Sequence, residues 1–192
     1  MALYAIGDLH LSLGTNKPMD VFGPKWANYV ERIRENFSKL NDDDVIVIAG
    51  DISWGMSLEQ SLPDFQFIDA LPGRKILLKG NHDYWWSSLS KMQQRYGAHF
   101  EFLQNDCIMA EDIAVCGTRG WLLPSAESFS AADRKIYNRE GIRLELSLQQ
   151  AHKMQAHQII TAFHYPPLFA RTEHTCFTNP VSYTHLRAHE TE

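Results

Sequence analysis

Residues 45–51 read VIVIAGD, four β-branched residues followed by an alanine, a glycine and an aspartate. An unbroken β-branched run is typical of a strand that is buried on both faces, as in a parallel sheet. A similar pattern recurs where an apolar run ends in Gly-Asp, Gly-Asn or His, at residues 3–8, 75–81 and 159–164. We therefore expect a mostly parallel sheet with polar residues at the carboxyl ends of its strands.

Helical patterns lie between these runs. Apolar residues recur at helical spacing from Trp26 to Leu40 and predict an amphipathic helix over 26–40. Further helices are expected at about 57–71, 84–96 and 131–157, and shorter strands at 100–103, 107–110 and 113–116. The alternation of strands and helices indicates an α/β fold.

Composition is ordinary for a folded protein. The 192 residues are 44% hydrophobic and 21% charged, with a formal net charge of −5 and no run of Lys or Arg, so a surface for nucleic acid is not favoured. No stretch approaches the roughly 20 apolar residues that span a bilayer. Three scattered cysteines, Cys107, Cys116 and Cys176, have no CxxC spacing and suggest reduced thiols in a cytoplasmic protein.

Residues of the metal-binding kind follow four of the expected strands. They are Asp8 with His10, Asp51, Asn81 with His82, and His164. In open α/β sheets the functional crevice lies beyond the carboxyl ends of the strands, so these side chains should meet there. A mixture of Asp and His suits Zn, Mn or Fe, and a pair of ions about 3.5–4 Å apart can activate water for attack on a phosphate ester.

The ordered blocks resemble the calcineurin-like metallophosphoesterase family. They are Gly7-Asp8-Leu9-His10, Gly50-Asp51, Gly80-Asn81-His82-Asp83 and His164, and strings such as KGNHDYWW and FHYPP are similar to a bacterial branch. The resemblance covers nearly all of residues 1–170. It implies a sandwich of two mixed β-sheets flanked by helices. It also implies hydrolysis of a phosphate mono- or diester through a metal-bridged hydroxide on two divalent ions, Mn, Fe or Zn.

The same resemblance implies a division of roles among the ligands. Asp8 and His10 resemble ligands of the first metal, and Asp51 resembles the bridging carboxylate. Asn81 and His164 resemble ligands of the second metal. Taken singly, each has a structural alternative, because Asp can cap a helix or turn, Asn-His can be a plain turn, and His164 can simply end a strand.

Three further residues are implied to act beside the metals. His82 resembles the histidine that faces the phosphate and protonates the leaving oxygen. Asp83 is expected to orient His82 through a hydrogen bond. Arg119, in CGTRGW, could contact the substrate phosphate or form a structural salt bridge.

The resemblance fades after Phe169. The family pattern ends in a Gly-His-x-His block that supplies one more ligand to each metal, and this sequence has no such block. Residues 181–191, VSYTHLRAHET, resemble the in-frame translation of a DNA sequencing adapter. We therefore expect an incomplete phosphoesterase domain over 1–180, without its C-terminal strands, and a non-native tail over 181–192.

Two function classes remain open from the sequence. The first is a phosphoesterase whose partner is a phosphate ester, with no membrane partner and with nucleic acid only as a substrate. The second is a non-catalytic metal-binding remnant or interaction scaffold on the same fold, because the Gly-His-x-His ligands are absent. The sequence does not define the substrate, the metals or the oligomeric state.

Overall fold

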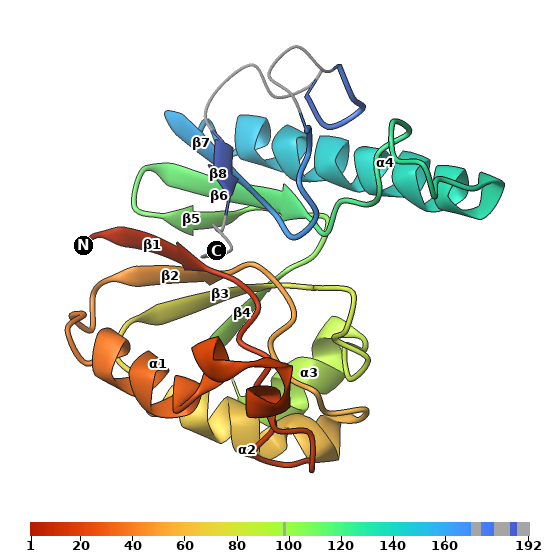
Figure 1. Ribbon diagram of the computed structural model, residues 1–192. Coiled ribbons are helices and arrows are strands. Elements are labelled where there is room, and N and C mark those ends of the chain that lie inside the picture. Colours follow the sequence, from red (N-terminus) through yellow and green to blue (C-terminus); the bar gives the residue numbers. More distant parts are fainter. Residues whose placement is uncertain (98, 170–173, 179–184, 188–192) are drawn as a thin grey trace. The chain divides into compact units, whose positions relative to one another are not determined.

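A computed structural model describes residues 1–97, 99–169, 174–178 and 185–187 of the chain (Figure 1). The chain divides into two compact units, residues 1–102 and 103–192. Each unit contains a four-stranded β-sheet with helical cover, so the predicted α/β class is confirmed.

The first unit is built on a sheet with the strand order β1-β2-β3-β4. Its strands are β1 (Leu3–Ile6), β2 (Val45–Ile48), β3 (Arg74–Leu78) and β4 (Phe100–Leu103). β1 pairs with β2, and β2 with β3, in parallel. All four residues of β2 are buried, as expected for the β-branched run. The carboxyl ends of β1, β2 and β3 therefore lie at one edge of the sheet.

Three α-helices lie along one face of this sheet (Figure 1). They are α1 (Tyr29–Phe37), α2 (Leu58–Asp69) and α3 (Leu89–Tyr96), and two short 3-10 turns precede α1, η1 (Met19–Phe22) and η2 (Pro24–Trp26). α1 is shorter than expected because Asn28, with φ 52°, breaks the helical path before it. α3 begins five residues late because residues 82–86 form tight turns instead.

An aromatic cluster fills the space between the sheet and these helices. Phe65 of α2 stacks on Tyr96 of α3 with ring centroids 3.7 Å apart. Trp85 and Phe100 meet Phe65 edge-on at 4.9 and 5.1 Å. This packing fixes α2 and the loop after β3 relative to the sheet.

The second unit has the strand order β5-β6-β7-β8. Its strands are β5 (Ile108–Ala110), β6 (Ile113–Thr118), β7 (Gln158–Phe163) and β8 (His185–Arg187). β5 is antiparallel to β6, whereas β6, β7 and β8 are parallel, so this sheet is mixed. β8 falls within the predicted non-native tail. Its pairing with β7 uses main-chain groups that any sequence carries, and the origin of the tail stays a prediction.

A long helix, α4 (Ala131–Lys153), covers one face of the second sheet (Figure 1). It begins with a capping box in which Ser130 and Asp133 satisfy each other's backbone amides. Leu144, Leu148 and other apolar residues of α4 pack in the core of this unit. The helix ends before the expected residue 157, next to the left-handed Gln155 with φ 55°.

All three cysteines are free thiols. Burial raises the pKa of Cys116 to about 12, so this thiol stays protonated at neutral pH and behaves as a small core residue. Among the described residues, no helix is both long and apolar enough to cross a membrane.

The aromatic cluster gives a stability prediction. Phe65→Ala should lower the free energy of unfolding by about 3–5 kcal/mol, because it removes a ring that touches α3, the sheet and the loop after β3. Urea denaturation measures this loss. Val21→Ala is the matched control, since Val21 is 72% exposed and its truncation should have little effect. A loss below about 1 kcal/mol for Phe65→Ala would show that the neighbouring side chains relax to fill the cavity that the substitution leaves.

Candidate metal centre

Asp8 and Asp51 are brought together by the loops that follow β1 and β2. The backbone pairing of the two strands continues past their ends, with the amide of Asp8 donating to the carbonyl of Gly50 at 3.0 Å and that of His10 to Asp51 at 2.9 Å. As a result, a carboxylate oxygen of Asp8 lies within 4.8 Å of one of Asp51. The loops thus place two predicted ligands at the same edge of the sheet.

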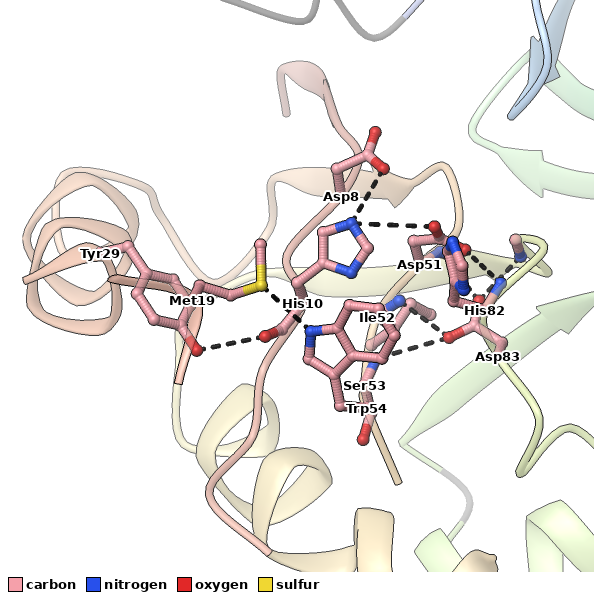
Figure 2. A network of polar contacts seen from close by, with 11 residues as sticks. Asp8, His10, Met19, Tyr29, Asp51, Ile52, Ser53, Trp54, His82 and Asp83 are labelled. Atoms are coloured by element: carbon pink, nitrogen blue, oxygen red, sulfur yellow. Dashed lines mark hydrogen bonds and ion pairs between the residues drawn. The ribbon is translucent and has the colours of Figure 1, made fainter. Parts of the chain in front are cut away.

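The imidazole of His10 points at both carboxylates (Figure 2). Its Nε2 lies 3.4 Å from Oδ1 of Asp8 and 3.7 Å from Oδ2 of Asp51. The Tyr29 hydroxyl donates to the His10 carbonyl at 3.1 Å and so holds the main chain of this loop. One nitrogen and two oxygen donors therefore converge on a small volume, and such a mixed set suits a transition metal.

The backbone is strained at each of these three residues. Asp8, His10 and Asp51 have φ values of 55°, 44° and 51°, in the left-handed region that non-glycine residues rarely adopt. Each such residue costs about 1–3 kcal/mol and persists only where the surrounding structure enforces it. Here the strained turns aim all three side chains toward one another.

The loop after β3 contacts the Asp51 carboxylate as well. The amide of His82 donates to Oδ1 of Asp51 at 2.8 Å. A Cβ at Gly80 would lie 2.1 Å from that same oxygen, so no larger residue fits there without displacing Asp51. Asn81, between these two residues, is half-buried. The loops after β1, β2 and β3 are thus assembled around the Asp51 carboxylate, as the sequence predicts.

Asp83 has a different role from the one expected. Its fully buried carboxylate accepts hydrogen bonds from the amides of Asp51 at 2.9 Å, Gly80 at 2.7 Å and Ile52 at 2.8 Å. The amide of Ser53 at 3.4 Å and Trp85 Nε1 at 3.0 Å also donate to it. Within the described parts of the chain, no hydrogen-bond partner of the Asp83 carboxylate is the His82 ring. Asp83 is occupied by main-chain donors, so it fixes the two loops and does not orient the imidazole.

Electrostatics at Asp83 are dominated by burial. Loss of solvent raises the pKa of its carboxyl group, the amide of Gly80 opposes the rise, and the nearby charge of Asp51 adds to it. Carboxylates packed this closely repel one another. A cation beside Asp8 and Asp51 would offset that repulsion.

An indole ring lines the histidines of this centre, and sequence reasoning missed it. Trp54 stacks on His10 with centroids 5.0 Å apart and lies 5.0 Å from the His82 ring (Figure 2). Its Nε1 donates to the sulfur of Met19 at 3.1 Å, and the Lys17 ammonium lies 5.0 Å over the ring. The only available signal was its place three residues after Asp51. Trp85, in contrast, packs in the core at 2% exposure.

In the second unit, His164 follows β7 as expected. It is half-buried, and its ring lies 5.5 Å from that of Tyr165. The Tyr165 amide donates to the carbonyl of Arg119 at 2.8 Å, which joins the loops after β6 and β7. The ligand role of His164 stays a prediction.

Arg119 forms a structural ion pair. Its Nη2 lies 3.8 Å from the buried carboxylate of Glu140, and its guanidinium lies 4.5 Å over the Trp121 ring. Glu140 also accepts from Arg143 at 2.9 Å and from the Thr118 hydroxyl at 2.6 Å. Burial lowers the pKa of Arg119, and the charge of Glu140 opposes that shift. These contacts support the salt-bridge alternative, and a contact with substrate stays a prediction.

Several solved structures resemble the chain. A protein of unknown function from Aquifex aeolicus is 20% identical, with a TM-score of 0.50 over 98% of this chain and 90% of that one. The phosphopantetheinyl hydrolase of Mycobacterium tuberculosis is 14% identical, with a TM-score of 0.42 over 92% and 73% of the two chains. The first likeness shows the fold. No curated protein matches the sequence.

A match to a protein-family model identifies the family of this chain. The model described as calcineurin-like phosphoesterase matches residues 1–190, which include every predicted ligand. This match agrees with the convergence of Asp8, His10 and Asp51 at the carboxyl ends of parallel strands. The chain belongs to the calcineurin-like phosphoesterase family.

Proposed function

We propose that the chain is a metal-dependent phosphoesterase that hydrolyses a phosphate mono- or diester at the centre formed by Asp8, His10 and Asp51. The observation that carries this proposal is the convergence of His10 Nε2 on the two carboxylates, at 3.4 and 3.7 Å, in loops with strained backbones. Strain of this kind clusters at functional sites. The family membership supports the reaction class.

The donor set fits divalent metal ions. Asp8 and His10 would hold one ion, and Asn81 and His164 a second, with Asp51 shared between them. Such ions supply Lewis acidity and lower the pKa of water. Mn, Fe or Zn suit this mixture of oxygen and nitrogen donors.

Charge also favours a metal-loaded centre. Asp8 and Asp51 carry two negative charges, which by themselves would repel a phosphate ester. Two divalent ions would reverse the sign of the centre, and neutral ligands such as Asn81 and the histidines would leave that positive charge in place. The few carboxylates at this edge of the sheet therefore suit an anionic substrate.

His82 is the candidate general acid. Its amide is held by Oδ1 of Asp51 at 2.8 Å, so the main chain fixes its position beside the ligands without using the ring. Its imidazole lies 6.0 Å from that of His10 and is lined by Trp54. In this place the imidazolium would donate its N–H proton to the leaving oxygen, a role that histidine fills well near neutral pH.

The alternative proposal is a metal-binding scaffold without turnover. It is motivated by the absence of a Gly-His-x-His block from the sequence. Loss of one ligand from each metal should weaken binding by more than the about 10–100-fold typical of residues that only support ligands. The two proposals therefore differ in metal content and in turnover.

Metal content and turnover test the proposal directly. We expect a chain extended with a Gly-His-x-His segment to hold close to two Mn ions and to hydrolyse p-nitrophenyl phosphate or bis-p-nitrophenyl phosphate. The 192-residue chain should bind Mn more weakly and turn over more slowly. Elemental analysis and release of p-nitrophenol measure both quantities. If neither chain binds Mn nor hydrolyses either ester, the phosphoesterase proposal fails.

Asp51→Asn should remove most of the activity of the extended chain. The substitution replaces one carboxylate oxygen by an amide that cannot bridge two cations, so kcat/KM should fall by at least about 100-fold and metal content should drop. Asp112→Asn is the control, because Asp112 is an exposed carboxylate between β5 and β6. Full metal content and activity in Asp51→Asn would remove Asp51 from the centre.

His82→Ala should separate chemistry from metal binding. We expect kcat to fall by about 10²–10⁴-fold, the usual contribution of a general acid, while metal content stays near that of the parent chain. Elemental analysis beside kinetics distinguishes the two effects. Loss of the metals in this variant would instead make His82 a ligand.

A further inference from the structure

A buried carboxylate of α2 reaches both loops that carry the first ligands. Asp64 is fully buried, and its Oδ1 accepts from the amide of Leu13 at 2.7 Å. Its Oδ2 accepts from the hydroxyl of Ser53 at 2.5 Å. Leu13 lies three residues after His10, and Ser53 lies two residues after Asp51. One side chain therefore ties the loop after β1 to the loop after β2.

Ser53 extends this tie along its own loop. Its Oγ also accepts from the amide of Gly55 at 3.0 Å, and its backbone forms a parallel bridge with Leu11. The hydroxyl thus donates to Asp64 and accepts from the loop at the same time. Directional bonds of this kind restrict the path of the chain between Asp51 and Gly55.

Both loops also lie directly against the first turns of α2. A Cβ at Gly14 would come within 1.9 Å of the Gln60 carbonyl oxygen, and one at Gly55 within 2.7 Å of the Ser61 amide nitrogen. Only glycine permits so close an approach. α2 is therefore the surface on which the two loops are shaped, and Asp64 supplies its hydrogen bonds to both.

Packing alone does not explain a carboxylate at this place. Burial raises the pKa of Asp64, and the bonds from Ser53 and Leu13 oppose that rise. Both of these partners are neutral, so the bonds offset only part of the cost of removing a charge from water. An apolar residue would avoid that cost, but it would leave the Leu13 amide and the Ser53 hydroxyl without this acceptor. What the carboxylate adds is two acceptors that point at two different loops.

We propose that Asp64 is a positioning residue of the metal centre. It holds residues 8–15 and 51–55 in the strained conformation that brings the side chains of Asp8, His10 and Asp51 together. The part that concerns metal binding rests on the proposed function. The part that concerns the order of the loops does not depend on a metal.

The chain offers a matched control at the opposite ends of the same strands. Asp44 is 3% exposed, and its carboxylate accepts from the amides of Ala2 at 2.6 Å and Asn41 at 2.9 Å. Like Asp64, it joins the segments that flank β1 and β2, but at their amino ends. Asp44→Asn therefore perturbs the same sheet without touching the ligand loops.

The experiment compares Asp64→Asn, Ser53→Ala and Asp44→Asn in the 192-residue chain. The first measurement is amide hydrogen exchange without metal. Asparagine accepts through one oxygen only, so Asp64→Asn should speed exchange at least about tenfold in residues 9–15 or 51–55. Ser53→Ala should speed it in 51–55, whereas Asp44→Asn should leave both loops unchanged.

The second measurement is Mn²⁺ titration of the same variants. Asp64→Asn should raise the Kd for Mn²⁺ by about 10–100-fold, as losses of supporting contacts do, and Asp44→Asn by less than about threefold. Thermal unfolding of the metal-free proteins is measured beside it. If Asp64 only stabilised the fold, Asp64→Asn would behave like Asp44→Asn: its Tm would fall and its Kd for Mn²⁺ would stay that of the parent.

Several outcomes would overturn the proposal. Asp64→Asn could show the same loop exchange rates and the same Kd as the parent or as Asp44→Asn. Asp64 would then stabilise the fold without positioning the ligand loops.

If Asp64→Asn does not fold, Ser53→Ala provides the test, because it removes one hydrogen bond to Asp64 and leaves α2 intact. Exchange rates and a Kd equal to those of the parent in this variant would contradict the proposal that Asp64 holds the two loops together. If the parent chain binds no Mn²⁺, loop exchange alone decides. Parental exchange in Asp64→Asn would then overturn the proposal, and faster exchange confined to the two loops would support it.

Discussion

The parallel register of β1 and β2 is the constraint on which the candidate centre depends. Ile6 lies beside Ile48, and the amide of Ala49 donates to the carbonyl of Ile6 at 2.7 Å. From this pairing the two chains leave the sheet together, so that Asp8 and Asp51 turn toward each other. A shift by one residue would send the side chains of one strand to the opposite face and separate the two carboxylates.

Much of this arrangement could be predicted because it follows from strand pairing. The β-branched run at residues 45–48 identifies a buried strand, and parallel strands place their carboxyl ends at one edge. The geometry therefore brings Asp8, His10, Asp51 and His82 together as the sequence indicates. The starts of the helices were less predictable, because they do not coincide with the start of the apolar periodicity. α1 begins only after the left-handed Asn28, and α3 begins only after the turns that follow His82.

The supporting residues could not be predicted, because their roles depend on contacts between distant segments. Asp64 lies 51 residues from Leu13, and Asp83 lies 32 residues from Asp51. In sequence Asp64 follows Pro63 within a helical pattern, where a carboxylate usually faces solvent. Its burial arises only when two loops fold over α2. The main-chain partners of Asp83 likewise depend on how closely Gly80 approaches Asp51.

Strain and charge at this edge of the sheet have a common consequence. Three left-handed residues and the mutual repulsion of close carboxylates both raise the free energy of the folded first unit. A cation that binds Asp8, His10 and Asp51 only in the folded chain would lower that free energy by mass action. Metal binding and folding of this unit should then be coupled, as they are in other metal sites built from separate loops. Neutral supports such as Ser53 suit this coupling, because they shape the loops without supplying a positive charge that would compete with the metal.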